Sequence, residues 1–325
     1  MLKMIAGLTL AAFTALASPA DAQDWPNRPV TLVVPYAAGG PVDTIARIIA
    51  ARLSEILGQQ MVIENVGGAG GLTGTVRVAK AAPDGYTLLL SGSAVLSQNP
   101  TFRKQSPYDP IADFAHVALF SDSARVLIAR KDFPPDDFKA FMAYVKANEN
   151  TLQYGSPGAG SGGHTCAVLL DRAMGAKITH VPYRGAGPAM QDLLGGRIDY
   201  MLEQISTATP QIKSNTVKAY VTLGLARGPG LEDIPTADEL GVKGLDCGAW
   251  SAFSFPKDTP PAIVQRLAKA SSDAIDTPAV IERFKAVGVV VTPKDRRSPE
   301  FLTQFVKSEL ARWVEPIKAS GVSLD

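Results

Sequence analysis

The sequence is poor in the residues that carry most enzyme chemistry. Its 325 residues include 3 histidines and 2 cysteines. His116, His164 and His180 are widely spaced and form no H-x-x-x-H pattern, which is poor support for a metal site. No G-x-S-x-G sequence is present to form the nucleophile elbow of a hydrolase. We therefore expect no metal, no cofactor and no catalytic residue in this chain.

The sequence also lacks an excess of charge of either sign. Lys and Arg number 32 against 31 Asp and Glu, which gives a net charge of +1, and aromatic residues make up 7% of the chain. Proteins that bind nucleic acid or anionic membranes through electrostatics carry a clear excess of positive charge. The basic residues here are scattered, with Arg296-Arg297 as the densest pair. The sequence therefore predicts no nucleic-acid partner.

Long apolar runs are missing except near the N-terminus. The stretch from Met4 to Ala17 is uncharged and apolar, follows Lys3 and precedes the A-x-A sequence Ala20-Asp21-Ala22. About 14 apolar residues are too few to span a bilayer as a helix, and this pattern is that of a secretory signal. We expect residues 1–22 to be a signal peptide that is cleaved after Ala22, which makes the mature protein periplasmic. A buried N-terminal helix is the alternative.

The two cysteines, Cys166 and Cys247, are too few and too far apart for a zinc site or a disulfide framework. In an oxidising compartment they pair if the fold brings them together. From the sequence, a disulfide and two free thiols both remain open.

Strands and helices alternate along the chain, which predicts an α/β fold with parallel strands and right-handed crossovers. In the first set we expect strands within 29–35, 61–64 and 86–90, a helix from Pro41 that stops at Gly58, and a helix at 72–81. In the second set we expect strands at 126–129, 152–156, 178–182, 198–202 and 217–223, and helices at 136–148, 161–174 and 188–194. After Gly244 we expect a returning strand at 250–255 and helices at 260–275, 279–286 and 299–319.

Two α/β sets followed by a C-terminal return indicate that one lobe is inserted within another. We expect residues 23–123 plus 248–325 to form lobe 1 and residues 124–247 to form lobe 2. A cleft between two lobes is a common place for a small ligand.

Two glycine-rich loops each lie between a predicted strand and a predicted helix. The first runs from Pro35 to Asp43, and its position at a helix start favours an anion. A plain turn in which Asp43 caps its own helix is the alternative. The second, from Ser156 to His164, fits G-x-G-x-x-G, but Pro157 removes a donor and no acidic residue ends the next strand. A second anion-facing helix start is the better interpretation, and a plain tight turn is the alternative.

Together with these loops, a set of short motifs resembles the Bug-type receptors, the TctC-like periplasmic solute-binding components of tripartite tricarboxylate transporters. The motifs span nearly the whole mature chain. They lie at 25–30, 34–40, Asp43, 46–47, 57–59, 64–65, 68–71, 83–88, 107–110, 113–114, 158–161, His164, 180–185, 192–196, 235–236 and Trp250.

This resemblance implies a two-lobed Venus-flytrap fold of the type II-like periplasmic-binding-protein class and no enzymatic activity. It implies that a ligand carboxylate is held by backbone N–H groups and ordered water rather than by arginine, and the first glycine loop indeed lacks Arg and Lys. The implied ligands are di- or tricarboxylates, aromatic carboxylates or acidic amino acids, and the implied partners are the membrane permease subunits of the transporter. We expect the receptor to be a monomer.

The expected ligand-binding residues come from both lobes. Backbone N–H groups of the first loop should bind one carboxylate, Arg184 is the candidate for a second one, and Glu203 would select an amine or hydroxyl or simply lie on the surface. The full set is Tyr36, Ala38, Gly39, Gly40, Ser91, Ser93, Ser156, Gly158, Ser161, His164, Tyr183, Arg184 and Glu203.

Two other functions stay open from the sequence alone. An exported receptor could present its ligand to a sensor instead of a permease, in which case a sensor kinase would be encoded beside it. A periplasmic esterase would depend on Ser161 or His164. Residues 165–168 and 202–204 depart from the pattern of the Bug-type receptors, and this leaves the identity of the ligand open.

Overall fold

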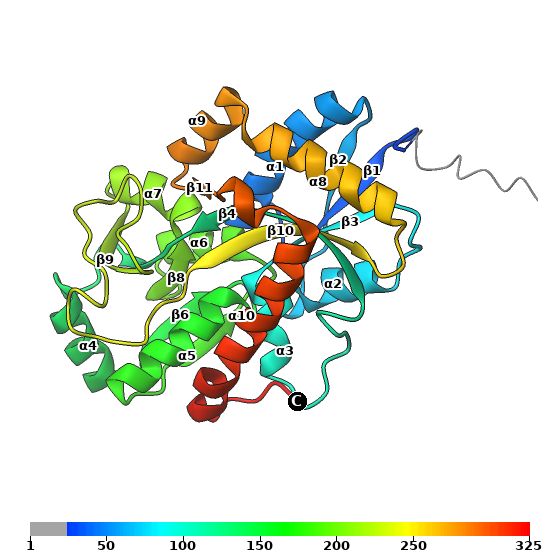
Figure 1. The fold of residues 1–325 in the computed structure, drawn as a ribbon. Coiled ribbons are helices and arrows are strands. Elements are labelled where there is room, and N and C mark those ends of the chain that lie inside the picture. The colour runs from blue at the N-terminus through cyan, green and yellow to red at the C-terminus, as the bar shows by residue number, and fades with distance from the viewer. Residues whose placement is uncertain (1–24) are drawn as a thin grey trace, which may run out of the picture.

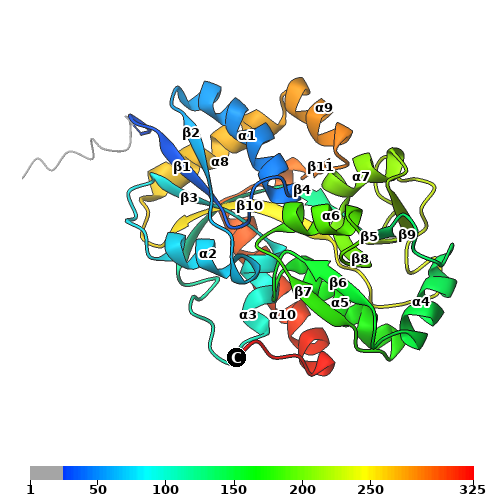
Figure 2. The same cartoon turned by 180° about the vertical axis from the view of Figure 1, so that it is seen from behind.

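A computed structural model describes residues 25–325 of the chain as two α/β lobes that lie side by side (Figure 1). Each lobe has a central sheet with helices packed on its faces, and Figure 2 shows the same arrangement from behind. The predicted signal peptide and its cleavage after Ala22 lie outside the described residues. None of the described helices is both long and apolar enough to cross a membrane.

The first sheet has six strands in the order β11-β4-β10-β3-β1-β2. β1 runs parallel to its neighbours β2 and β3, as the alternation of strands and helices predicts, while β10 is antiparallel to both β3 and β4. The strands are β1 (Val30–Val34), β2 (Met61–Asn65), β3 (Thr87–Gly92), β4 (Phe114–Ser123), β10 (Ala249–Pro256) and β11 (Val290–Val291).

The helices around this sheet begin and end close to the predicted residues. α1 (Pro41–Leu57) starts at a proline and stops at Gly58, whose φ of 69° is left-handed and suits glycine. Its apolar face, with Ile45, Ile49 and Leu53, is fully buried in the lobe's core. The other helical segments are η1 (Ala69–Gly71), α2 (Leu72–Ala79), η2 (Ala94–Gln98), α3 (Asn99–Thr101), α8 (Pro261–Ile275), α9 (Pro278–Ala286) and η3 (Lys294–Arg296).

The second sheet has five strands in the order β7-β6-β8-β5-β9. β6 is parallel to β7 and β8, and β5 is antiparallel to β8 and β9. Its strands are β5 (Arg125–Arg130), β6 (Gln153–Ser156), β7 (Thr179–Pro182), β8 (Tyr200–Gln204) and β9 (Val217–Leu223). Its helices are α4 (Phe138–Ala147), α5 (Gly162–Met174), α6 (Ala186–Leu194) and α7 (Ile205–Lys213).

The chain crosses between the sheets twice. β4 of the first sheet ends at Ser123 and β5 of the second begins at Arg125, and the chain returns between β9 and β10. In the returning segment Cys247 forms a disulfide with Cys166 of α5, which answers the question that the sequence left open.

The C-terminal helix α10 (Pro299–Ser320) packs against both lobes. Leu302 and Val306 are buried in a core cluster with residues of the first sheet, whereas Trp313 and Ile317 are buried with residues of the second. The sequence analysis assigned this whole helix, including Phe301, Phe305 and Leu310, to lobe 1. These three side chains are partly buried beside the core. The residue boundaries of the lobes stay a prediction.

Candidate functional site

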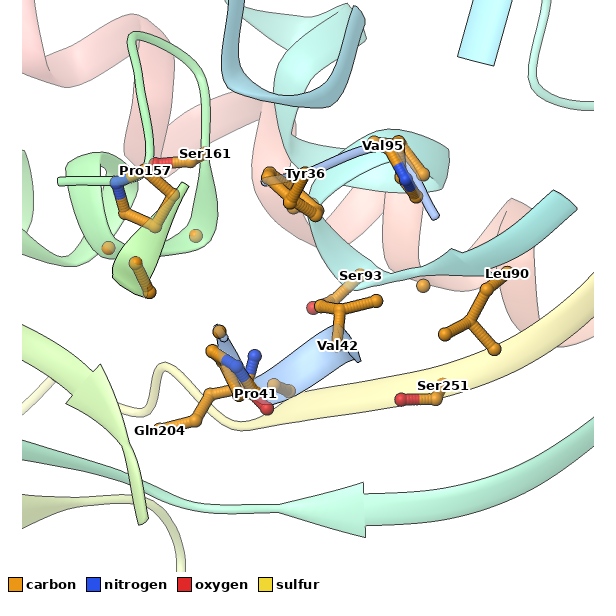
Figure 3. A pocket seen from close by; sticks show the side chains of 18 of the residues that line it. Tyr36, Pro41, Val42, Leu90, Ser93, Val95, Pro157, Ser161, Gln204 and Ser251 are labelled. Atoms are coloured by element: carbon orange, nitrogen blue, oxygen red, sulfur yellow. The ribbon is translucent and has the colours of Figure 1, made fainter. Parts of the chain in front are cut away.

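A narrow cavity of about 50 Å³ lies between the lobes (Figure 3). It is lined at the carboxyl ends of β1 and β3 from the first sheet and of β6 and β8 from the second. The antiparallel strands β5 and β10 begin at the same edge, so Arg125 and Trp250 also line it. This edge of an α/β sheet is where ligands usually bind, because loops and helix starts meet there.

Six of the residues expected to bind ligand line this cavity, and they come from both lobes. In Figure 3, Ser161 and Pro157 lie on the side opposite Leu90 and Ser251, with Tyr36 and Ser93 between them. The six are Tyr36, Gly40, Ser91, Ser93, Ser161 and Glu203.

The first glycine loop uses part of its hydrogen-bonding capacity on itself. The N–H of Gly39 donates to Oδ2 of Asp43 at 3.0 Å, which ties the loop to the first turn of α1, although no side chain caps the helix itself. Burial opposes ionisation of Asp43, but hydrogen bonds from Arg47, Gly39 and Asn65 hold its pKa below the ordinary value. Ala38 and Gly39 are exposed and do not line the cavity. Of Ala38, Gly39 and Gly40, whose backbone N–H groups were expected to bind the carboxylate, only Gly40 is at the cavity wall.

Gly40 does not need to be glycine for its backbone conformation. Its φ of −91° and ψ of 176° are open to any residue. A Cβ at this position would touch Ala186 of the second lobe at 3.5 Å, which is ordinary contact. A small side chain at Gly40 would therefore cause no backbone strain, and only a longer side chain would obstruct the cavity.

The serines at the cavity wall differ in their availability. Ser91 donates to the carbonyl of Ala252 at 3.0 Å and lies 3.0 Å from Oγ of Ser254, which ties it to β10. Ser161 caps α5 by accepting from the N–H of His164. The hydroxyl of Ser93 makes no hydrogen bond within residues 25–325, so it is the one best placed to reach a ligand.

Ser156, Gly158 and His164 lie behind the cavity wall rather than on it. Oγ of Ser156 lies 2.6 Å from Nε2 of His180, and the rings of His164 and His180 are 4.4 Å apart. Burial lowers the pKa of His164 to about 4. Burial also lowers the pKa of His180, helped by His164, to about 3. These side chains pack the second glycine loop onto its lobe, and their ligand contacts stay a prediction.

Tyr183 and Arg184 also lie away from the cavity lining. The hydroxyl of Tyr183 donates to Oδ2 of Asp192 at 2.7 Å, and burial together with this bond raises its pKa to about 12. The side chain of Arg184 is exposed, while its carbonyl accepts from the N–H of Ala37 in the first lobe at 3.0 Å. Arg184 thus joins the lobes through its backbone.

Arg125 is a cavity residue that the sequence reasoning missed. It is 4% exposed and lines the cavity, yet its guanidinium makes no hydrogen bond or ion pair with any described residue. Burial lowers its pKa, and the charges of Glu203 and Tyr36 act in the opposite direction. Glu203 is buried as well, and burial raises its pKa against the effects of Arg125, Thr207 and Gln204. The cavity wall therefore carries a buried arginine and a buried glutamate.

The described residues do not assemble a catalytic or metal site. No group of three or more His, Cys, Asp or Glu within 25–325 is arranged to hold a metal ion. Ser161 receives its hydrogen bond from the backbone of His164, not from the imidazole, whose Nδ1 accepts from the N–H of Gly160. Ser156 and His180 do pair, but no carboxylate within the described chain hydrogen-bonds to that histidine to orient it.

Known proteins resemble this chain in both sequence and structure. A model described as the tripartite tricarboxylate transporter family receptor matches residues 45–322. The solved periplasmic binding protein BugD is 41% identical with a TM-score of 0.89, covering 92% of this chain and 99% of its own. MatC from Rhodopseudomonas palustris with bound malate is 40% identical with a TM-score of 0.88, covering 90% and 100%. An R. palustris protein with adipate is 31% identical with a TM-score of 0.86, covering 92% and 99%.

Proposed function

The chain belongs to the tripartite tricarboxylate transporter receptor family, and we propose that it captures a small carboxylate between its lobes and delivers it to membrane permease subunits. The family consists of solute-binding receptors, so the chain is a binding protein and not an enzyme, as predicted. Its location is periplasmic, while cleavage after Ala22 stays a prediction. The observation that carries the proposal is a cavity between the lobes at which the starts of α1 and α5 meet.

The size and wall of the cavity support a compact anion as the ligand. A space of about 50 Å³ holds a few water-sized groups, which suits a small compact ligand and leaves no room for a nucleotide. Helix starts offer free N–H groups and the positive end of the helix dipole. MatC with malate and the R. palustris protein with adipate are relatives that hold dicarboxylates in this fold. We infer a di- or tricarboxylate, an aromatic carboxylate or an acidic amino acid for this chain.

A thermal-shift screen on the mature protein tests this ligand class. A ligand that binds only the folded state stabilises it by about 2.7 kcal/mol at a hundredfold excess over Kd, so a matching carboxylate should raise the Tm by several degrees. Sugars and cations serve as controls and should leave the Tm unchanged. A strong response to a sugar, with none to any carboxylate, would contradict the proposal. Chelator treatment should not alter the carboxylate response.

Delivery to a permease requires a separate experiment. Uptake of the labelled carboxylate identified in the screen should fall in cells that lack this protein and return when it is supplied. If uptake is unchanged while a carboxylate-responsive gene loses its induction, the receptor serves a sensor instead.

A further inference from the structure

Arg125 is buried in the cavity wall without a partner for its charge. It is 4% exposed, and its Nε has no hydrogen-bond partner within the described chain. A guanidinium stays protonated even when buried, so its charge must be balanced by something near it. Proteins rarely bury an arginine in this way unless it is paired. The missing partner is therefore expected in the space that the residue faces, which is the cavity.

The start of α5 adds to the positive field at Arg125, and the charge of Glu203 opposes this field without a hydrogen bond or ion pair to the guanidinium. A Cβ built on Gly162 would lie 2.0 Å from Nη2 and 2.7 Å from Cζ of Arg125, so the guanidinium lies directly against the first residue of α5. A cation at a helix N-terminus is unfavourable, because the dipole is positive there. An anion in the cavity would be attracted by the guanidinium and by the free N–H groups of Gly162 and Gly163 at the same time.

Glu203 acts on Arg125 through its charge but is not its hydrogen-bonded partner. Arg125 pairs with Gln204 and Val126 pairs with Glu203, so the Arg125 and Glu203 side chains lie on opposite faces of the sheet. Within the described residues the two side chains interact through their charges, with no hydrogen bond or ion pair between them. Oε1 of Glu203 accepts from the N–H of Gln204 and from Oγ1 of Thr207, at 3.0 and 2.9 Å. Its other oxygen has no donor from the described chain.

We propose that Arg125 pairs with a ligand carboxylate and that Glu203, across the sheet edge, accepts a hydrogen bond from a hydroxyl or ammonium group of the same ligand. The site then selects carboxylates that carry a neighbouring donor over plain carboxylates. This inference rests on the proposed function and makes it more specific. It also differs from a purely backbone cradle, because a charged side chain binds the anion.

Calorimetry with three matched ligands tests whether Glu203 selects a ligand with a neighbouring donor group. Malate carries a hydroxyl and aspartate an ammonium group on the succinate skeleton, which carries neither. The wild-type protein should bind malate or aspartate at least about tenfold more tightly than succinate, since each good charge-assisted bond is worth a factor of this order. The preferred donor, hydroxyl or ammonium, follows from the comparison of malate with aspartate. Equal affinity for all three ligands would overturn the role of Glu203, and Glu203→Gln should remove the preference.

The variant Arg125→Met tests whether Arg125 pairs with the ligand carboxylate. Affinity for every carboxylate should fall by about 100-fold, because a buried charge partner is removed. The unliganded variant should nevertheless have an unchanged or higher Tm, since an unpaired buried charge has been replaced by an apolar side chain. A residue with a purely structural role would instead show a lower Tm. Arg172→Met, at an exposed arginine of the same lobe, is the control and should change neither quantity.

The outcomes separate this inference from the proposed function. If the wild-type protein binds carboxylates and Arg125→Met keeps its affinity within a few-fold, the pairing is wrong while the receptor function stands. If the wild-type protein binds no carboxylate, both are wrong.

Discussion

At the scale of single residues, Gly162 and Arg125 show why sequence reasoning identified some of the residues that line the cavity and missed others. The glycine loops were recognisable because they lie between a strand and a helix. Arg125 lies far from both loops along the chain, and its pattern is that of an ordinary first residue of an apolar strand. The one feature of the sequence that could have identified it is its charge directly before the apolar run Val126-Leu127-Ile128-Ala129. Every side chain of that run is buried. Only the fold brings that strand start beside α5.

Gly162→Ala should weaken carboxylate binding by displacing the Arg125 guanidinium. The backbone at Gly162 is not left-handed, so alanine causes no backbone strain there. The added Cβ would lie 2.0 Å from Nη2 and force the side chain away from the start of α5. We expect a loss of about tenfold by calorimetry, of the order of one charge-assisted hydrogen bond. In an Arg125→Met background the same change should have no further effect. A tenfold loss in both backgrounds would show that Gly162 acts independently of Arg125.

The three histidines should titrate well below their ordinary range. Burial lowers the pKa of His116 to about 4, and those of His164 and His180 are about 4 and 3. The unfolded chain takes up protons near 6.5, whereas the folded chain stays neutral until the pH is much lower. Each histidine therefore contributes stability above pH 6.5 that is lost as the pH falls towards 4. Imidazole proton shifts measured by NMR should show midpoints below about 5, and a midpoint near 6.5 would contradict the burial.

At the scale of elements, patterns of apolar residues predicted most helices and strands because each buries one face or both. The structure adds β4, α7 and β11, which the sequence reasoning did not identify. β4 carries His116, Ser121 and Asp122 among its apolar residues, so it matches neither the alternating nor the continuous apolar pattern. α7 contains Pro210, which argues against a helix when sequence is the only guide. Tertiary packing, and not the local sequence pattern, therefore determines that β4 is a strand and α7 a helix.

The disulfide between Cys166 and Cys247 joins α5 to the segment that returns to the first lobe. The two residues are 81 apart in sequence and fully buried. Closing a loop of this length in the unfolded chain is worth about 4.5 kcal/mol in the chain-entropy model. The double variant Cys166→Ala and Cys247→Ala should therefore lose stability of that order in urea unfolding. Wild-type protein under reducing conditions should behave similarly. Two reactive thiols in the denatured oxidised protein would contradict the pairing.

At the scale of the whole molecule, the two lobes touch through backbone at glycines. A Cβ at Gly70 would lie 2.2 Å from the carbonyl oxygen of Ala159, and one at Gly67 would lie 2.5 Å from that of Arg184. Contacts this close need residues without side chains, so the lobes approach as far as the backbone allows. The sequence predicted two lobes with a cleft, but it could not show which glycines face the other lobe, because that depends on how the lobes pack.

Gly187→Ala should hinder closure of the lobes without harming either lobe. Gly187 lies in α6, where alanine is at least as favourable as glycine, but the new Cβ would lie 2.8 Å from the carbonyl oxygen of Ala38 in the first lobe. We expect the Tm without ligand to stay unchanged. The affinity should fall about tenfold, which corresponds to roughly 1.4 kcal/mol of binding free energy. Small-angle scattering should show a smaller ligand-induced contraction than in the wild type. Gly195→Ala, whose nearest contacts lie within its own lobe, is the matched control. Equal contraction in all three proteins would refute this role.

The central claim is that this receptor holds one small carboxylate between its lobes. Isothermal titration of the mature protein with malate, adipate and a panel of tricarboxylates, aromatic carboxylates and acidic amino acids tests it most directly. We predict saturable binding of at least one compound at one site per chain, with the ligand recovered unchanged. Absence of binding across the panel, together with saturable binding of a sugar or a cation, would contradict the claim.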